Sequence, residues 1–186
     1  MRVISGSARG RPLKAVPGSG TRPTTDKVKE ALFSMIGPYF DGGDVLDLFA
    51  GTGGLGIEAL SRGMARGVFI DADAKSVDVV RSNLEATKLT EQAEVYRNDA
   101  FRALKALAKR EAAFELVFLD PPYRLKRIVE LLDELQELRL LKPGATVVVE
   151  HDAGDMQEEQ VGQLRQRRRA EYGDTAITIY ELEGNA

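Results

Sequence analysis

Short apolar runs alternate with segments of helical spacing along most of this 186-residue chain. The apolar runs predict strands, which we place near 45–49, 67–70, 93–96, 114–119 and 145–150. The segments that follow them predict helices, which we place near 55–62, 74–88, 101–110 and 126–138. Strands that alternate with helices are typical of a parallel sheet covered by helices on both faces. The sequence therefore predicts a doubly wound α/β fold.

The C-terminal segment departs from this alternation. Two β-like runs, 167–172 and 175–182, flank the dipeptide Gly173-Asp174, which is a hairpin signal. We expect this hairpin to add an antiparallel edge, which gives a mostly parallel sheet of seven strands. Ligands of such sheets bind at the carboxyl ends of the strands, so we expect the functional site there.

The N-terminal segment has a third pattern. Residues 1–24 are rich in glycine and proline and hold short β-like pieces, which predicts a loose hairpin and loop. Thr25 is placed to cap a helix over 26–36 with one apolar face, which Gly37-Pro38 ends. We expect a single domain over 1–186, comprising an N-terminal arm or hairpin (1–24), an N-terminal helix (25–37) and a core (44–186).

The composition excludes several kinds of site. The chain has no cysteine and one histidine, His151. Disulfides, thiolate metal sites, a cysteine nucleophile and any site that needs two imidazoles are therefore excluded, and no metal is expected. No apolar run approaches the ~20 residues that span a bilayer, and no secretory signal follows Met1. These features predict a cytoplasmic protein that does not bind membranes.

The net charge of −3 is unevenly distributed. Residues 1–29 carry seven Lys or Arg and one Asp, a net charge of +6, which leaves −9 for the rest of the chain. A basic segment on an acidic body favours a polyanionic partner. A solvated tail without a partner is the alternative, and charge alone does not separate the two.

The first predicted strand leads into a glycine-rich turn. Gly51, Gly53 and Gly56 fit the pattern G-x-G-x-x-G between a strand and a helix, where glycines let backbone N–H groups approach a ligand. This pattern occurs in NAD-dependent oxidoreductases and in other nucleoside-binding proteins. Asp47 favours the second group, because a buried carboxylate at the strand end needs a partner such as a ligand ammonium.

Acidic residues also follow the next two predicted strands. Asp71 follows the second strand, where a carboxylate can accept hydrogen bonds from a ribose diol. Asp99 follows the third strand, where an acid can bind the amino edge of adenine. Each of these acids could instead be a helix N-cap. Three acids at the ends of three successive strands nevertheless favour a nucleoside site.

The fourth predicted strand ends in Asp120-Pro121-Pro122-Tyr123. Two prolines make a rigid turn, and a rigid turn alone does not explain an acid and an aromatic residue beside it. The fixed backbone would aim the Asp120 carboxylate and the Pro121 carbonyl at one point, where both could accept hydrogen bonds from an exocyclic amine. Tyr123 would offer a face on which the planar base stacks.

Together these motifs resemble a class I S-adenosylmethionine-dependent methyltransferase of the amine-methylating kind, which has a Rossmann-like fold. Arg9-Gly10-Arg11 and the run RPTTDKVKEALF over 22–33 resemble one family more narrowly. That family is the RsmD-type bacterial 16S ribosomal RNA guanine-N2 methyltransferases. The similarity covers nearly the whole chain and is weakest over about 151–170.

The resemblance implies methyl transfer from S-adenosylmethionine to the N2 amine of a guanine in 16S ribosomal RNA, free or in the small ribosomal subunit, by a monomer. The implied catalytic residues are Asp120, Pro121, Pro122 and Tyr123. The implied cofactor-binding residues are Asp47, Phe49, Ala50, Gly51, Thr52, Gly53, Gly56, Asp71, Ala72, Asn98, Asp99 and Ala100. The implied RNA-binding residues are Arg9, Arg11, Arg22 and Lys27.

Three other functions remain open from the sequence. A DNA adenine-N6 methyltransferase uses a similar motif, but only about 44 residues precede the first predicted core strand, which leaves little room for a target-recognition domain. An NAD-dependent oxidoreductase is compatible with the glycines alone. A non-catalytic RNA-binding protein on the same scaffold is disfavoured by the intact run from Asp120 to Tyr123.

Overall fold

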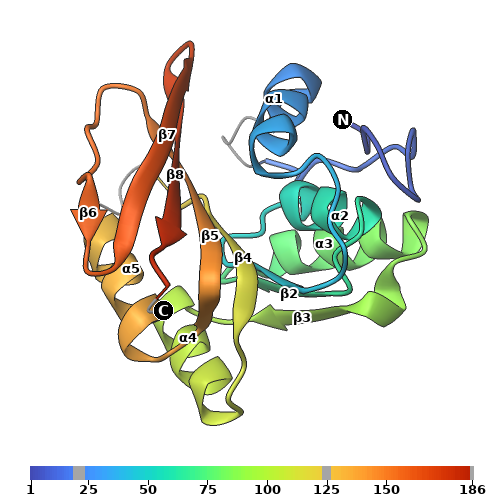
Figure 1. Cartoon of the computed structure of the whole chain (residues 1–186). Helices are drawn as coiled ribbons and strands as arrows, with labels where there is room; N and C mark the ends of the chain where they lie inside the picture. The colour runs from blue at the N-terminus through green and yellow to red at the C-terminus, as the bar shows by residue number, and fades with distance from the viewer. Residues whose placement is uncertain (19–23, 123–126, 185–186) are drawn as a thin grey trace.

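A computed structural model describes residues 1–18, 24–122 and 127–184. These residues form one 8-stranded sheet with the order β3-β2-β1-β4-β5-β8-β7-β6 (Figure 1). Five strands pair in parallel: β1 (Asp44–Asp47), β2 (Arg66–Asp71), β3 (Ala93–Arg97), β4 (Phe114–Leu119) and β5 (Leu141–Asp152). Three more extend the sheet by antiparallel pairing: β6 (Gln160–Val161), β7 (Leu164–Tyr172) and β8 (Thr175–Leu182).

Helices cover both faces of the sheet (Figure 1). On one face α1 (Asp26–Ile36), α2 (Gly54–Ser61) and α3 (Ala74–Ala86) pack in one apolar cluster, and a short 3-10 helix, η1 (Thr90–Gln92), follows α3. On the other face α4 (Ala100–Lys109) and α5 (Ile128–Glu137) pack in a second cluster. The predicted doubly wound α/β fold is confirmed. No helix within the described ranges is both long and apolar enough to cross a membrane.

The predicted count of seven strands is wrong, because the described residues form eight. The additional strand is β6, which has two residues and pairs with the start of β7 through Val161 and Leu164. Two residues are too few to show the alternation of apolar and polar positions that marks a strand. The fifth strand also begins earlier than predicted, at Leu141, ahead of Pro143 and Gly144.

The N-terminal arm is packed on the helices and does not extend into solvent as a free tail. Val3, Ala8, Leu13 and Val16 are all buried. The predicted hairpin is present in a short form, with one antiparallel bridge between Arg2 and Pro12. The basic side chains in the described part of the arm are exposed, while its buried apolar side chains complete the core over α1 and α2.

A buried cluster of charges fixes the arm in place. The fully buried carboxylate of Glu58 on α2 accepts hydrogen bonds from the backbone N–H groups of Ile4 (2.9 Å) and Ser5 (3.1 Å). It also accepts a hydrogen bond from Arg62 Nε (2.8 Å) and lies 3.6 Å from Lys29 Nζ. The Lys29 ammonium in turn donates to the Arg2 carbonyl (2.7 Å). Burial lowers the pKa of Lys29, and the charge of Glu58 opposes that shift.

Candidate active site

The expected site lies at the carboxyl edge of the sheet, where the chain changes direction. From β1 the chain adds β2 and β3 on one side, and it then returns to add β4 and β5 on the other. The reversal leaves a topological switch point between β1 and β4, which is where open α/β sheets bind ligands. The turn between β7 and β8 lies at the same edge, because Thr175 pairs with Asp152 at the end of β5.

Asp47 is a buried carboxylate at the end of β1. It is 3% exposed and accepts a hydrogen bond from the N–H of Gly56 (3.0 Å) in the first turn of α2. Burial raises the pKa of Asp47 to about 7, and the charges of Asp71 and Glu150 add to that shift. Gly56 must be glycine here, since a Cβ would lie 2.4 Å from a ring carbon of Phe69. The helix therefore approaches the acid closely.

The turn after β1 has the conformation that its glycines predict. Gly51 and Gly53 have φ angles of +57° and +80°, which L side chains rarely adopt. The N–H of Gly51 donates to Asp71 Oδ2 (2.9 Å), while Asp71 Oδ1 accepts from the N–H of Asp73 (2.9 Å). A Cβ on Gly51 would meet nothing within 4 Å. Open space therefore lies beside a rigid turn whose neighbouring carboxylate is held by two backbone donors.

Asn83 on α3 ties this turn to the N-terminal arm, and the sequence did not predict it. Its Nδ2 donates to the Thr52 carbonyl (2.8 Å) and to the Lys14 carbonyl (3.1 Å), and its Oδ1 accepts from the Lys14 N–H (2.8 Å). The side chain is 1% exposed. An asparagine inside a polar-faced helix gives no sequence signal of such a role.

Asp99 lies at the start of α4 and is exposed. It is the N-cap of that helix and accepts a hydrogen bond from the Arg102 N–H (3.2 Å), so the N-cap alternative is confirmed for this residue. The N-cap of α3 is Asp73 rather than Asp71. The β2 and β3 ends meet, since the Asn98 N–H donates to the Asp71 carbonyl (3.0 Å).

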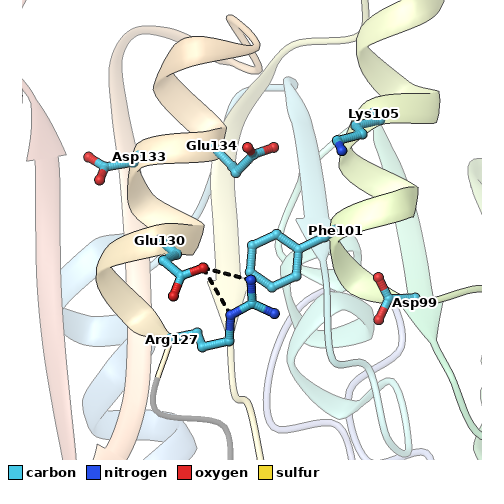
Figure 2. Close-up of a pocket in the computed structure, with 7 residues that line it drawn as sticks. All are labelled: Asp99, Phe101, Lys105, Arg127, Glu130, Asp133 and Glu134. Atoms are coloured by element: carbon cyan, nitrogen blue, oxygen red, sulfur yellow. Dashed lines mark hydrogen bonds and ion pairs between the residues drawn. The ribbon is translucent and has the colours of Figure 1, made fainter.

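A pocket of about 350 Å³ opens beside Asp99, between α4 and α5. Figure 2 shows Arg127 reaching from the start of α5 over the ring of Phe101, with Asp99 and Lys105 on the α4 side. The guanidinium carbon of Arg127 lies 4.0 Å from the ring centroid, and its nitrogens donate to Glu130. The sequence did not predict Phe101 and Arg127 as site residues, because they contact each other in the fold but lie far apart in the sequence.

The residues after β4 lie next to the end of β5. Asp120 is exposed, Pro121 is buried and Pro122 is exposed, while Tyr123 lies outside the described residues. Although the residue as a whole is exposed, desolvation of its carboxyl group raises the pKa of Asp120 well above its ordinary value, and the nearby acids Glu150 and Asp47 add to that shift. Glu150 was not predicted as a site residue. Its neighbour in the sequence, His151, is buried and contacts Thr178 (2.7 Å).

The remaining predicted cofactor contacts surround the same turn. Phe49 is half-buried and Ala50 is buried after β1, while Ala72 is exposed after Asp71 and Ala100 is buried after Asp99. The structure thus brings the ends of β1, β2, β3 and β4 into one acidic region. An ionised carboxylate accepts hydrogen bonds and cannot donate them. Their arrangement fits a ligand that carries positive charge and several N–H or O–H donors.

Of the predicted RNA-binding residues, Arg9 and Arg11 lie on the arm and Lys27 lies on α1. Arg9, Arg11 and Lys27 are exposed, and Arg22 lies outside the described residues. Arg9 lines a polar groove of about 490 Å³ between the arm and α1. Tyr39, which is 62% exposed, lines the same groove and contacts Ser5 Oγ through its hydroxyl (2.7 Å).

Comparison with known proteins gives full-length matches. The family model described as "Conserved hypothetical protein 95" matches residues 1–181. "Putative rRNA methyltransferase YlbH" of Bacillus subtilis is 55% identical over 99% of this chain and 100% of its own length. "Ribosomal RNA small subunit methyltransferase D" of Escherichia coli is 32% identical over 98% of this chain and 90% of its own.

A solved structure extends the similarity to three dimensions. "Putative methyltransferase yhhF from Escherichia coli" superposes with a TM-score of 0.84 and is 33% identical. The match covers 100% of this chain and 99% of that one. The arm, the doubly wound core and the C-terminal antiparallel strands therefore all belong to the shared architecture.

Proposed function

The chain belongs to the RsmD family of ribosomal RNA small subunit methyltransferases, and we propose that it methylates the N2 amine of a guanine in 16S ribosomal RNA. The observation that carries the proposal is the exposed Asp120 beside the rigid Pro121-Pro122 turn, at the edge that also holds Asp47 and Asp71. In our proposal the acceptor for the target amine and the acceptors for a donor-rich cofactor are thereby adjacent.

S-adenosylmethionine supplies the methyl group, on a sulfonium that is already a good leaving group. The residues of the carboxyl edge fit it by their chemistry. Asp47 would accept the ammonium of its amino-acid tail, Asp71 would accept the ribose diol, and Asp99 would accept the adenine amine. The open space beside Gly51 lets this ligand lie against the backbone of the turn.

The target amine needs activation, because its lone pair is delocalised into the guanine ring. In our proposal its two N–H groups donate to the Asp120 carboxylate and to the Pro121 carbonyl. That arrangement favours a pyramidal nitrogen with an available lone pair and aligns it with the methyl group. Tyr123 would stack on the base, which must leave its helix or loop to enter the site.

The N-terminal arm would hold the RNA backbone. Arg9, Arg11, Arg22 and Lys27 would contact phosphates, which position the substrate without reading its sequence. The groove beside Arg9 and the exposed ring of Tyr39 offer room for an unstacked base near those contacts. Because ribosomal RNA is a cytoplasmic substrate, we also propose that the protein acts in the cytoplasm, as a monomer.

The decisive experiment is nucleoside mass spectrometry of 16S ribosomal RNA. Small subunits and free 16S RNA, both from cells that lack the enzyme, would be incubated with the protein and labelled S-adenosylmethionine. We expect label in N2-methylguanosine. Label in adenine of DNA, offered in a parallel reaction, would overturn the proposal in favour of a DNA methyltransferase, and no label in any nucleic acid would favour a non-catalytic role.

A further inference from the structure

The strands β4 and β5 place two carboxyl groups side by side at the carboxyl edge. Leu119 and Val149 are paired in the parallel register, so Asp120 and Glu150 are the next residues on the two strands. Side chains alternate between the faces of a sheet. Phe118 and Val148 belong to the cluster under α1, α2 and α3. Asp120 and Glu150 lie two residues further along their strands, so their side chains are expected on the same face of the sheet as that cluster.

The charges around this pair are acidic. Asp120 and Glu150 each shift the pKa of the other, and the charge of Asp47 on β1 raises that of Asp120. Asp71 acts on Asp47 in turn. Among the described residues, the groups that shift the pKa of the pair include no cation. Two carboxylates side by side on neighbouring strands cannot both be ionised at low cost, and a shared proton resolves the repulsion.

We propose that Glu150 is a positioning residue for methyl transfer: it shares one proton with Asp120 and so holds that side chain, with one negative charge on the pair, against the acceptor amine. The inference rests on the proposed function and extends it to a residue that no motif includes. Desolvation raises the pKa of both groups, which favours a proton retained between them.

The shared proton also gives the reaction a balanced route. The amine lone pair forms the bond to the methyl carbon, and the carbon–sulfur bond breaks with its electron pair left on sulfur. The methylated nitrogen, now positive, gives one N–H proton to the Asp120 oxygen that faces it. The proton shared with Glu150 then moves fully onto Glu150, which is half-buried and passes one proton to water.

Two substitutions separate positioning from proton exchange. Glu150→Gln keeps a donor to Asp120 but cannot take a proton. Because Asp120 stays in position, the single-turnover rate of this variant on small subunits should fall by less than the ~100-fold expected for loss of a general base. Glu150→Ala removes the contact, and misplacement of Asp120 should lower the rate by about 100-fold. KM for RNA and the affinity for S-adenosylhomocysteine should not change. Glu181→Gln, an exposed change on β8, is the matched control.

A second readout needs no RNA. Infrared spectra are recorded at neutral pH in an Asp47→Asn background, which removes the carboxyl group whose pKa of about 7 would overlap the signal. A protonated carboxyl band should be present in that background and with Glu181→Gln added. Adding Glu150→Gln or Asp120→Asn should shift or remove the band, because the proton then has no second carboxylate to share. A band unchanged in frequency and intensity with Glu150→Gln, or a wild-type rate in Glu150→Ala, would overturn the inference.

The two proposals fail in different ways. If the wild type does not methylate guanine, the proposed function falls, while the infrared spectra still decide whether the pair shares a proton. If guanine is methylated but the band is missing from the Asp47→Asn background, the inference falls and the proposed function stands. Circular dichroism of each variant shows whether it is folded, and Glu150→Gln keeps the test valid should Glu150→Ala not fold.

Discussion

At the scale of single residues, three of the acids at the carboxyl edge lie in three different environments. Asp47 is buried with one backbone donor, Asp71 is held by two backbone donors, and Asp120 is exposed beside a second acid. The environment of a carboxyl group sets its affinity for protons and for ligand donors. Residues of one chemical type therefore serve three different parts of the reaction in the proposed function.

Asp120 should be required for transfer and not for cofactor binding. Asp120→Ala removes the proposed acceptor for the amine and is expected to lower the single-turnover rate by about 1,000-fold, within the range for a lost catalytic group. Calorimetric titration with S-adenosylmethionine should give a Kd within about twofold of the wild type. A large loss of cofactor affinity would show that Asp120 belongs to the cofactor site instead.

Asp47 predicts a pH dependence of cofactor binding. Its carboxyl group has a pKa of about 7 in the free protein, and only the ionised form attracts an ammonium. Affinity for S-adenosylmethionine should therefore increase as the pH rises through about 7, by up to about tenfold per pH unit below that value. Asp47→Asn should bind more weakly and lose this dependence, as measured by titration calorimetry.

The same group affects stability with the opposite sign. A pKa raised by folding stabilises the fold at low pH, and that contribution is lost as the pH rises through the folded value. Asp47→Asn, whose side-chain oxygen can still accept from Gly56, should thus gain stability relative to the wild type as the pH rises from 3.8 to about 7, with no further gain above that value. The exposed Asp78→Asn change on α3 serves as the control. Equal pH profiles for Asp47→Asn and the wild type would refute the assignment.

Some site residues were predictable because a motif places them, and others were not. Asp47 and Asp71 end β1 and β2, and Asp120 follows β4, so their common location follows from the topology alone. Glu150 also ends an apolar run, but its meaning depends on β5 lying next to β4, which strand order decides. The contact of Phe101 with Arg127 likewise needs the packing of α4 against α5.

At the scale of elements, the predicted bounds were most accurate for helices and strands that have a local sequence signal at each end. Thr25 accepts the N–H of Val28 (3.3 Å) and α1 begins where predicted, while β4 and β8 have the predicted bounds. The packing of the arm escaped prediction, since its buried side chains follow no regular period. The burial of Lys29 and Glu58 was also not predicted, because isolated charged residues on helices usually face solvent.

The Glu58 cluster should control the stability of the arm. Glu58→Ala leaves Lys29 and Arg62 buried without their anion, and the unfolding free energy should fall by about 3–5 kcal/mol. Lys29→Met should cost less, because Glu58 keeps Arg62 and two backbone donors. Urea unfolding measures both changes. Equal losses for the two variants would contradict this account.

At the scale of the whole molecule, the fixed arm presents positive charge on one side of an acidic body. RNA affinity should decrease with salt, and removal of each cation that binds a phosphate should reduce the slope of log K against log salt by about 0.7–0.9. Arg9→Ala combined with Arg11→Ala should therefore flatten the salt dependence, as fluorescence anisotropy can measure. Lys109→Ala, exposed on α4, should leave the slope unchanged.

The hydrogen bonds of Asn83 make the two binding regions thermodynamically dependent on each other. One amide holds both the turn beside the proposed cofactor site and the arm that would hold RNA. A ligand that orders either region lowers the entropic cost of ordering the other, so the two ligands should bind cooperatively and by the same factor in both directions. Asn83→Leu should abolish this cooperativity, so that titration of each ligand gives the same Kd with and without the other ligand bound. A single buried amide would then decide whether the protein recognises its two reactants jointly or separately.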